Sequence, residues 1–299
     1  MDWSSDRRLQ RRMVGSLALT LVGYAALLGG LYWLLPRSLA LPAGALLVLA
    51  LVVQVREADR IAYLLTRGIA LSRETYPPVY DTVGRVARGA DMPMPAVAVV
   101  PTEERNAFAA GTGKRTVVCV TLGLLKALDE RELEAVVAHE LAHLKNGDST
   151  VLTVAAFPTA VALFLLSSAG SLARASTGSV LRFWFFGQAL GLALLVAVVG
   201  APLLLASLPG TLVLSRYREF AADRGAVAIT GDPVGLAEAL GTLYGAPRPP
   251  TADLRRVATF NAFCIVPTAS LPAWLPSTHP PTAERIRRLG DLAREIEQA

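Results

Sequence analysis

The chain has 299 residues, of which 53% are hydrophobic and only 18% are charged. This composition excludes a disordered protein and an ordinary soluble one, and it favours a chain that is partly solvated by lipid. No nucleic-acid-binding motif accompanies the net charge of +5, so we attribute the basic excess to membrane orientation and anionic headgroups. Two cysteines, Cys119 and Cys264, exclude a disulfide-rich secreted scaffold.

The first predicted elements are two apolar helices near the N-terminus. Residues 13–35 contain no charge, and residues 38–55 form a second uncharged segment after a very short link. Each is long enough to cross a hydrocarbon core of about 30 Å as a helix. The short link predicts that the two helices form an antiparallel hairpin in the membrane.

The next part of the chain predicts a mixture of helix and strand. Residues 79–88 have a helical pattern, and residues 96–100 form a short apolar strand. Residues 106–110 and 115–121 flank a glycine-rich turn, which is typical of a β-hairpin.

The helix predicted over residues 130–145 contains the candidate metal-binding and catalytic residues. It begins with a capping-box pattern at Asp129, is expected to stop at Asn146-Gly147, and contains the motif His139-Glu140-Leu141-Ala142-His143. Two neutral imidazoles one turn apart can chelate Zn²⁺, and the glutamate beside them can take a proton from bound water. An apolar stripe runs along the helix and alanines lie opposite it, so we expect the helix to be buried, with a metal and its water as partners for these polar groups.

Two more uncharged segments follow, at residues 149–173 and 183–215. Both are long enough to span a bilayer, and the second can tilt or kink because it is longer than needed. Pro158 interrupts the first of them, so a re-entrant segment or one packed on protein stays open as an alternative.

A catalytic zinc ion needs a third protein ligand and keeps its fourth position for water. Glu219 and Asp223 are four residues apart and share a helix face just after the last apolar segment. The first carboxylate can bind the metal, and the second can accept the free N–H of a ligating histidine. Spacing alone leaves Glu238, Glu284 and His279 as alternative third ligands.

The arginines determine the predicted orientation. They cluster before the first apolar segment, after the second and after the fourth, whereas the opposite links contain few. The positive-inside rule therefore predicts a multi-pass protein of the plasma (inner) membrane with both termini in the cytoplasm. We divide the chain into residues 1–55 with the first hairpin, 56–148 with the first soluble part, 149–215 with the second transmembrane pair, and 216–299 with the second soluble part.

Taken together, these motifs resemble the HtpX family of membrane zinc metallopeptidases, which is related to the CAAX prenyl proteases. The matching pieces are Asn106-Ala107-Phe108-Ala109, the HExxH motif with Asp148, residues 215–223, and Ser277-Thr278-His279-Pro280-Pro281 leading to Arg285-Ile286. Their order and the four apolar segments also match, so the resemblance covers nearly the whole chain.

The resemblance implies one Zn²⁺ per chain, with His139, His143 and Glu219 as ligands. It implies that Glu140 is the general base of peptide hydrolysis. It makes Asp223 the partner of a ligating histidine, without indicating which one.

The resemblance also implies how a substrate is held. His279 would donate a hydrogen bond to the oxyanion or to the substrate backbone. The residues Asn106, Ala107, Phe108 and Ala109 would form an edge strand to which an extended peptide adds. The low charge of this segment fits such a role, because an unused edge is normally protected.

The fold implied is mainly α with a small β-hairpin or sheet, in which four transmembrane helices accompany a cytoplasmic zincin-like (gluzincin) domain. The implied substrates are polypeptides, with quality control of damaged or misfolded membrane proteins under stress as the role. The lipid bilayer is the other expected partner, and nucleic acid is not expected.

Two alternatives stay open at this point. One is an intramembrane protease of the site-2 type, whose HExxH motif lies inside an apolar span; the charges that flank the motif here disfavour it. The other is a non-enzymatic membrane scaffold with the same fold, which the complete set of ligands and base disfavours.

Overall fold

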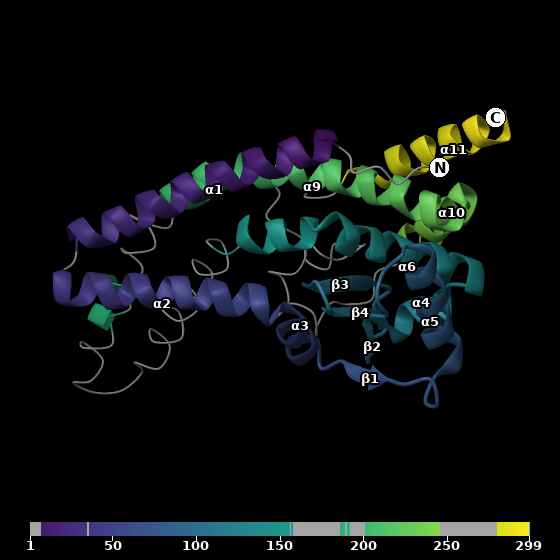
Figure 1. Ribbon diagram of the computed structural model, residues 1–299, viewed down its shortest axis with the longest axis horizontal. Helices are drawn as coiled ribbons and strands as arrows, with labels where there is room; N and C mark the ends of the chain where they lie inside the picture. Colours follow the sequence, from purple (N-terminus) through teal and green to yellow (C-terminus); the bar gives the residue numbers. More distant parts are fainter. Residues whose placement is uncertain are drawn as a thin grey trace. The chain divides into compact units, whose positions relative to one another are not determined.

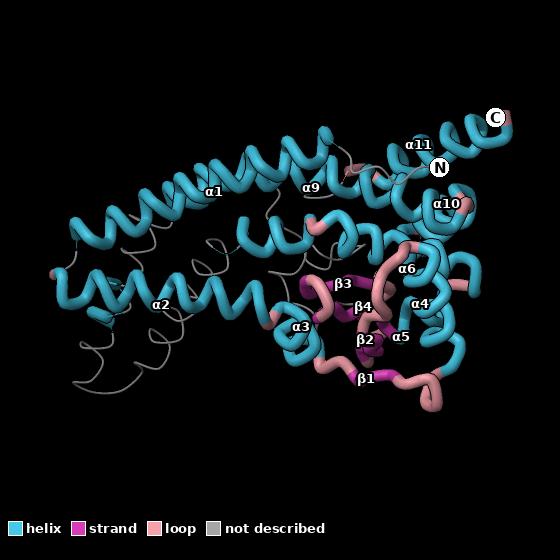
Figure 2. Tube along the Cα trace, viewed as in Figure 1, coloured by secondary structure: helices cyan, strands magenta, loops and turns pink. Residues whose placement is uncertain are grey.

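The computed structural model describes residues 7–34, 36–155, 157, 186–188, 190–191, 201–245 and 280–298. The chain divides into two compact units. Unit 1 comprises Met1–Met13, Val53–Leu152 and Leu212–Ala299, and unit 2 comprises Val14–Val52 and Thr153–Thr211. The described residues are mainly helical with one small mixed sheet, as predicted (Figure 2).

Two long apolar helices begin the described chain. They are α1 (Arg7–Leu34) and α2 (Arg37–Arg56) (Figure 1). Among the described residues, the stretches long and apolar enough to cross a membrane are Gln10–Gly30 and Arg37–Arg56, which agree with the first two predicted spans. Many of their large apolar side chains are exposed, as expected for surfaces that lipid covers. Most of the third predicted segment lies outside the described residues, whereas residues 201–215 of the fourth belong to the helix α9 (Ala201–Thr230).

The sheet of unit 1 has the strand order β1-β2-β4-β3. Its strands are β1 (Ile69–Leu71), β2 (Ala96–Val100), β3 (Ala107–Thr112) and β4 (Arg115–Thr121). Strands β2 and β4 are parallel, whereas the other two pairs are antiparallel. Gly111, with φ of 103°, lets β3 turn into β4, because a Cβ there would lie 2.0 Å from the Arg115 carbonyl oxygen. The predicted hairpin is confirmed, and β3 lies at an edge of the sheet.

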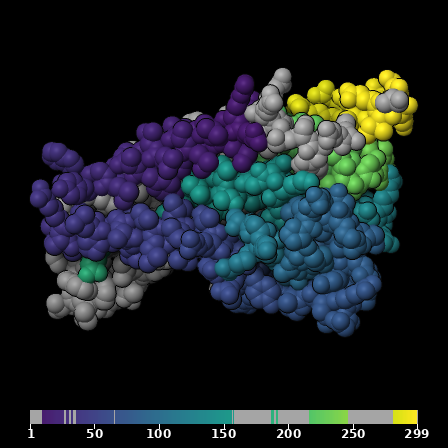
Figure 3. Space-filling view, in the orientation of Figure 1, coloured from purple at the N-terminus to yellow at the C-terminus, as the bar shows by residue number. Residues whose placement is uncertain are grey.

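Helices cover both faces of this sheet. Ala107 and Ala109 of β3 face a core shared with α4 and α6. Phe108 and Ala110 face the opposite side, where Ala62 of α3 packs against them. The C-terminal helices pack on one another, and the space-filling view shows the green atoms of α10 against the yellow atoms of α11 (Figure 3). The remaining described helices are α3 (Ala58–Thr66), α4 (Pro77–Gly89), α5 (Leu122–Ala127), α6 (Glu130–Asn146), α9 (Ala201–Thr230), α10 (Pro233–Tyr244) and α11 (Thr282–Glu297).

Helix α6 has the ends that its sequence predicts. The Asp129 side chain accepts from the Glu132 N–H at 2.8 Å, and the Glu132 carboxylate accepts from the Asp129 N–H at 3.0 Å. Gly147 ends the helix in the left-handed region, with φ of 69°. This helix is not among the described stretches that are long and apolar enough to cross a membrane.

Candidate metal centre

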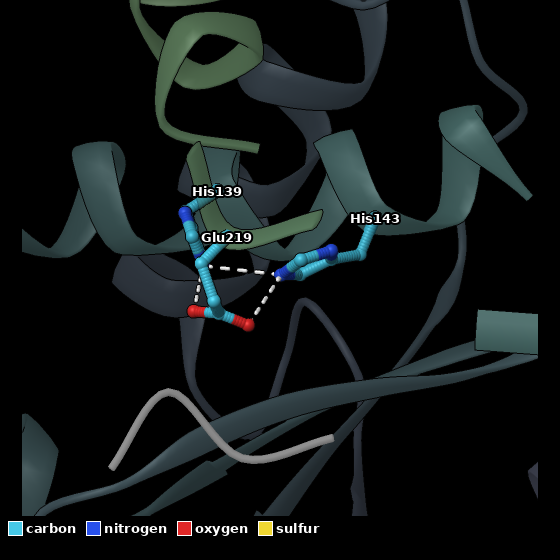
Figure 4. A group of neighbouring side chains, drawn as sticks. All are labelled: His139, His143 and Glu219. Carbon is cyan, nitrogen blue, oxygen red and sulfur yellow. Dashed lines mark hydrogen bonds and ion pairs between the residues drawn. The ribbon is translucent and has the colours of Figure 1, made fainter. Parts of the chain in front are cut away.

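Three side chains from two helices converge on one point inside unit 1. His139 and His143 are one turn apart on α6, and Glu219 reaches them from α9 (Figure 4). The two Nε2 atoms are 3.2 Å apart, and the Glu219 oxygens lie 3.6 Å from Nε2 of His139 and 3.7 Å from that of His143. One potential ligand atom from each residue lies within 4.8 Å of the other two, and all three residues are buried.

A carboxylate holds the outer nitrogen of each imidazole. Nδ1 of His139 lies 3.1 Å from Oδ1 of Asp223, and Nδ1 of His143 lies 3.1 Å from Oδ2 of Asp148. A proton on each Nδ1 leaves the Nε2 lone pairs facing the common point. Asp223 thus contacts His139, and the sequence alone did not indicate which histidine it would contact. Asp148 makes the equivalent contact with His143.

Two buried arginines neutralise this concentration of acid. Nη1 of Arg285, on α11, lies 3.1 Å from Oε2 of Glu219, and its Nη2 donates to Asp223 at 2.6 Å. Nη2 of Arg218 donates to Oε1 of Glu219 at 3.1 Å. The sequence included Arg285 only in a matching motif, and nothing local distinguished Arg218 from its neighbouring arginines. Both are buried because α9 and α11 place them against the cluster.

Glu140 is buried beside the three ligand candidates. Neither of its oxygens has a hydrogen-bond partner in the described part of the chain. Burial raises the pKa of this carboxyl to about 8. A buried carboxyl costs free energy unless a polar group contacts it, so this cluster requires such a group. A metal ion with a water molecule fits this requirement, and two imidazoles with one carboxylate are a donor set that suits zinc.

The two histidines differ in protonation. Burial lowers the pKa of both imidazoles. At His139 the hydrogen bonds with Asp223 and Glu219 outweigh burial and raise the pKa to about 9. At His143 burial prevails, and its pKa stays below the ordinary value.

Metal binding to the metal-free protein at pH 7 should therefore release protons. With its pKa at about 9, His139 is protonated at pH 7 and must lose a proton before Nε2 can bind a metal. The apparent affinity should rise by roughly tenfold per pH unit for each proton released. Calorimetry in buffers of different ionisation enthalpy measures the release. Uptake of protons, or no release at pH 7, would contradict this protonation state.

The alternative third ligands lie elsewhere. Glu238 pairs with Arg131 at 3.0 Å, and Glu284 pairs with Arg288 at 2.7 Å. Neither glutamate belongs to the cluster. His279 lies outside the described residues.

The predicted substrate strand corresponds to the edge strand β3. The backbone carbonyl of Asn106 accepts from the Thr121 N–H at 3.0 Å, so the alternation of an antiparallel pair directs the backbone groups of Ala107 and Ala109 away from β4. The Asn106 side chain accepts from the Ala107 N–H at 2.9 Å. Phe108 is buried on the face that α3 covers, so it belongs to the core of unit 1.

The sequence of this chain is similar to those of known peptidases. Residues 75–293 match Peptidase family M48. Protease HtpX homolog 1 of Streptomyces coelicolor is 40% identical, over 99% of this chain and 96% of that protein. Protease HtpX homolog 2 of Methanosarcina acetivorans is 36% identical over 98% of each. The crystal structure of S. mikatae Ste24p is similar with a TM-score of 0.48 and 18% identity, over 82% of this chain and 56% of that one. The chain therefore belongs to Peptidase family M48 and is a metallopeptidase related to the HtpX proteases.

Proposed function

We propose that this peptidase is a zinc-dependent endopeptidase whose metal is held by His139, His143 and Glu219. The observation that carries the proposal is the convergence of two Nε2 atoms and one carboxylate on a buried point. The outer carboxylates of Asp148 and Asp223 support it, because they fix both imidazoles in the tautomer that a metal needs. Three protein ligands leave one position open for water and substrate, as in catalytic zinc sites.

Glu140 is the general base in this proposal. Zinc, when bound, supplies Lewis acidity to a peptide carbonyl and lowers the pKa of water. The Glu140 carboxylate takes the proton from the attacking water and returns it to the leaving amine. Burial raises the pKa of this carboxyl above that of an exposed glutamate, which makes its carboxylate a stronger base.

The substrate would bind as an extra strand on β3. The backbone of Ala107 and Ala109 is directed toward the open edge, and an extended peptide can hydrogen-bond there. Asn106 shapes the start of this edge through its bond to the Ala107 N–H. Phe108 supports the strand from the core side. His279 would donate to the oxyanion, as the family resemblance implies.

The chain is a membrane protein, and we propose that it crosses the inner membrane four times with both termini and the peptidase unit in the cytoplasm. The exposed apolar surfaces of α1 and α2 and the distribution of arginines support this topology. Unit 1 contains both Val53–Leu152 and Leu212–Ala299, which supports a peptidase domain assembled from residues 56–148 and 216–299. Its substrates are polypeptides, and we propose damaged or misfolded membrane proteins among them.

Chelation should abolish the activity, and zinc should restore it. Casein digestion by the detergent-purified chain should stop after treatment with EDTA, because the donor set requires a metal to activate water. Zn²⁺ should restore digestion, whereas Mg²⁺ should not, because it prefers an octahedral set of oxygen ligands. Digestion that persists without metal would contradict the proposal and favour a different hydrolytic mechanism.

A further inference from the structure

One buried hydroxyl joins three segments of the chain at the beginning of the edge strand β3. Thr121 ends β4, and its side chain accepts from the Asn106 N–H at 2.9 Å and from the Leu124 N–H at 3.2 Å. The same hydroxyl donates to the backbone carbonyl of Glu104. A hydroxyl has one proton and two lone pairs, so these three bonds use its full capacity.

The bond from Asn106 takes the place of a regular bond of the sheet. The Thr121 N–H donates to the Asn106 carbonyl at 3.0 Å, as in a hydrogen-bonded antiparallel pair. In such a pair the Asn106 N–H would donate to the Thr121 carbonyl in return. That carbonyl faces the first turn of α5, because Thr121 is the N-cap of this helix. The hydroxyl accepts the N–H instead, so the side chain of Thr121 fixes the point at which β3 begins.

The segment before β3 also lies directly against the backbone of α5. The Gly123 N–H donates to the Thr102 carbonyl at 2.9 Å. A Cβ at Gly123 would lie 2.1 Å from the carbonyl oxygen of Glu103, so this close approach requires glycine. Residues 102–106 are therefore held at the first turn of α5 by two neighbouring backbone contacts and by the Thr121 hydroxyl.

The position of β3 matters because this strand packs against the helix that contains the HExxH motif. Ala107 and Ala109 belong to the core that β3 shares with α6. The turn at Gly111 fixes the far end of β3, and the contacts of Thr121 fix its beginning. A strand edge that holds a substrate must keep a constant position relative to the catalytic groups, because a small displacement of the reacting atoms slows the reaction.

We propose that Thr121 is a positioning residue for the substrate, because its hydroxyl holds the beginning of β3 where the strand can pair with an extended peptide. The inference rests on the substrate strand given under the proposed function and adds the group that sets its place. Thr121 itself is buried and acts through β3. Without the hydroxyl, the Asn106 N–H and the Glu104 carbonyl lose this partner, and residues 102–106 shift.

The test is the steady-state kinetics of the full detergent-purified chain on a fluorogenic peptide. Thr121→Val has the same shape without the hydroxyl, and its KM should rise about tenfold. Its kcat should stay within about twofold of the wild type, because β3 holds the peptide equally in the ground state and the transition state. Thr121→Ser keeps the hydroxyl and should restore the KM of the wild type.

The matched control makes the identical change on the same strand. Thr116 is also buried, and it lies at the other end of β4, opposite Gly111. Thr116→Val should leave KM unchanged, because the beginning of β3 keeps its contacts. Equal KM values for Thr121→Val and Thr116→Val would overturn the proposal.

A second substrate distinguishes a failure of this inference from a failure of the proposed function. Peptides N-methylated at single amides lack one backbone donor each, so pairing with β3 predicts that the best-placed methyl group raises the KM of the wild type about tenfold. In Thr121→Val the same methyl group should raise KM only about twofold, because the two changes affect one contact. An equal penalty in both proteins would overturn this inference alone, whereas no penalty in the wild type would overturn the substrate strand as well.

Hydrogen exchange separates a shift of β3 from general unfolding. Amides of residues 102–106 should exchange faster in Thr121→Val than in the wild type, whereas α6 should keep its protection and the chain its metal content. Thr121→Cys is a milder form of the same loss, since a thiol is a weak hydrogen-bonding group, and it keeps the test valid if the valine variant does not fold. Its KM should rise several-fold, and a wild-type KM together with faster exchange of residues 102–106 would contradict the proposal.

Discussion

Glu140→Gln will keep its metal and lose peptide hydrolysis by about 10²- to 10⁴-fold. The carboxamide has nearly the same shape as the carboxylate, so the neighbouring imidazoles keep their positions. It cannot accept a proton from water, however, and neither oxygen of Glu140 bonds to another group within the described structure that would share its role. The measurement is kcat/KM on a fluorogenic peptide, together with metal content by elemental analysis.

The matched control for this variant lies on the same helix. Glu134→Gln makes the identical chemical change on the exposed side of α6, where Glu134 pairs with Arg85 at 3.1 Å. Surface ion pairs of this kind contribute little to stability, so the control should retain full activity. Turnover by Glu140→Gln equal to that of Glu134→Gln would remove Glu140 from the mechanism.

Glu219→Ala will lose most of its bound metal. The substitution removes one of the three proposed protein ligands and takes one carboxylate away from the buried guanidiniums of Arg218 and Arg285, of which Arg285 keeps its bond to Asp223. Removing one partner of a buried ion pair costs about 3–5 kcal/mol, so this variant is also expected to be less stable. Zinc content after dialysis and the unfolding midpoint measure the two effects.

A second variant separates metal loss from unfolding. Glu219→Gln keeps the size of the side chain and loses the charge, so it should fold better than the alanine variant and still bind metal weakly. Glu238→Ala is the control, because Glu238 was an alternative third ligand and instead pairs with Arg131. If both Glu219 variants kept as many zinc ions per chain as Glu238→Ala, Glu219 would not be a ligand and another residue would have to take its place.

Local signals in the sequence predicted the elements that carry the site. The capping box at Asp129 and the stop at Gly147 delimit α6 correctly because both act within a few residues. The glycine-rich turn of the β3–β4 hairpin is equally local. The positions of Glu219 and Asp223 on one helix face also followed from spacing, since α9 extends through both residues.

Contacts between distant segments could not be predicted from such signals. Which histidine Asp223 contacts depends on how α9 packs against α6, and spacing along either helix does not contain that information. The burial of Arg285 depends on α11 docking against both helices, so an arginine typical of a surface helix became the centre of an ion-pair cluster. The three-residue strand β1 exists through its pairing with β2, and its own sequence is too short to indicate a strand.

The most direct test of the metal centre is anomalous diffraction from crystals of the full chain at the zinc absorption edge. The account predicts one peak per chain, at about 2.0–2.2 Å from Nε2 of His139, Nε2 of His143 and a carboxylate oxygen of Glu219. A peak elsewhere, or a zinc ion that touches the two histidines but not Glu219, would contradict it.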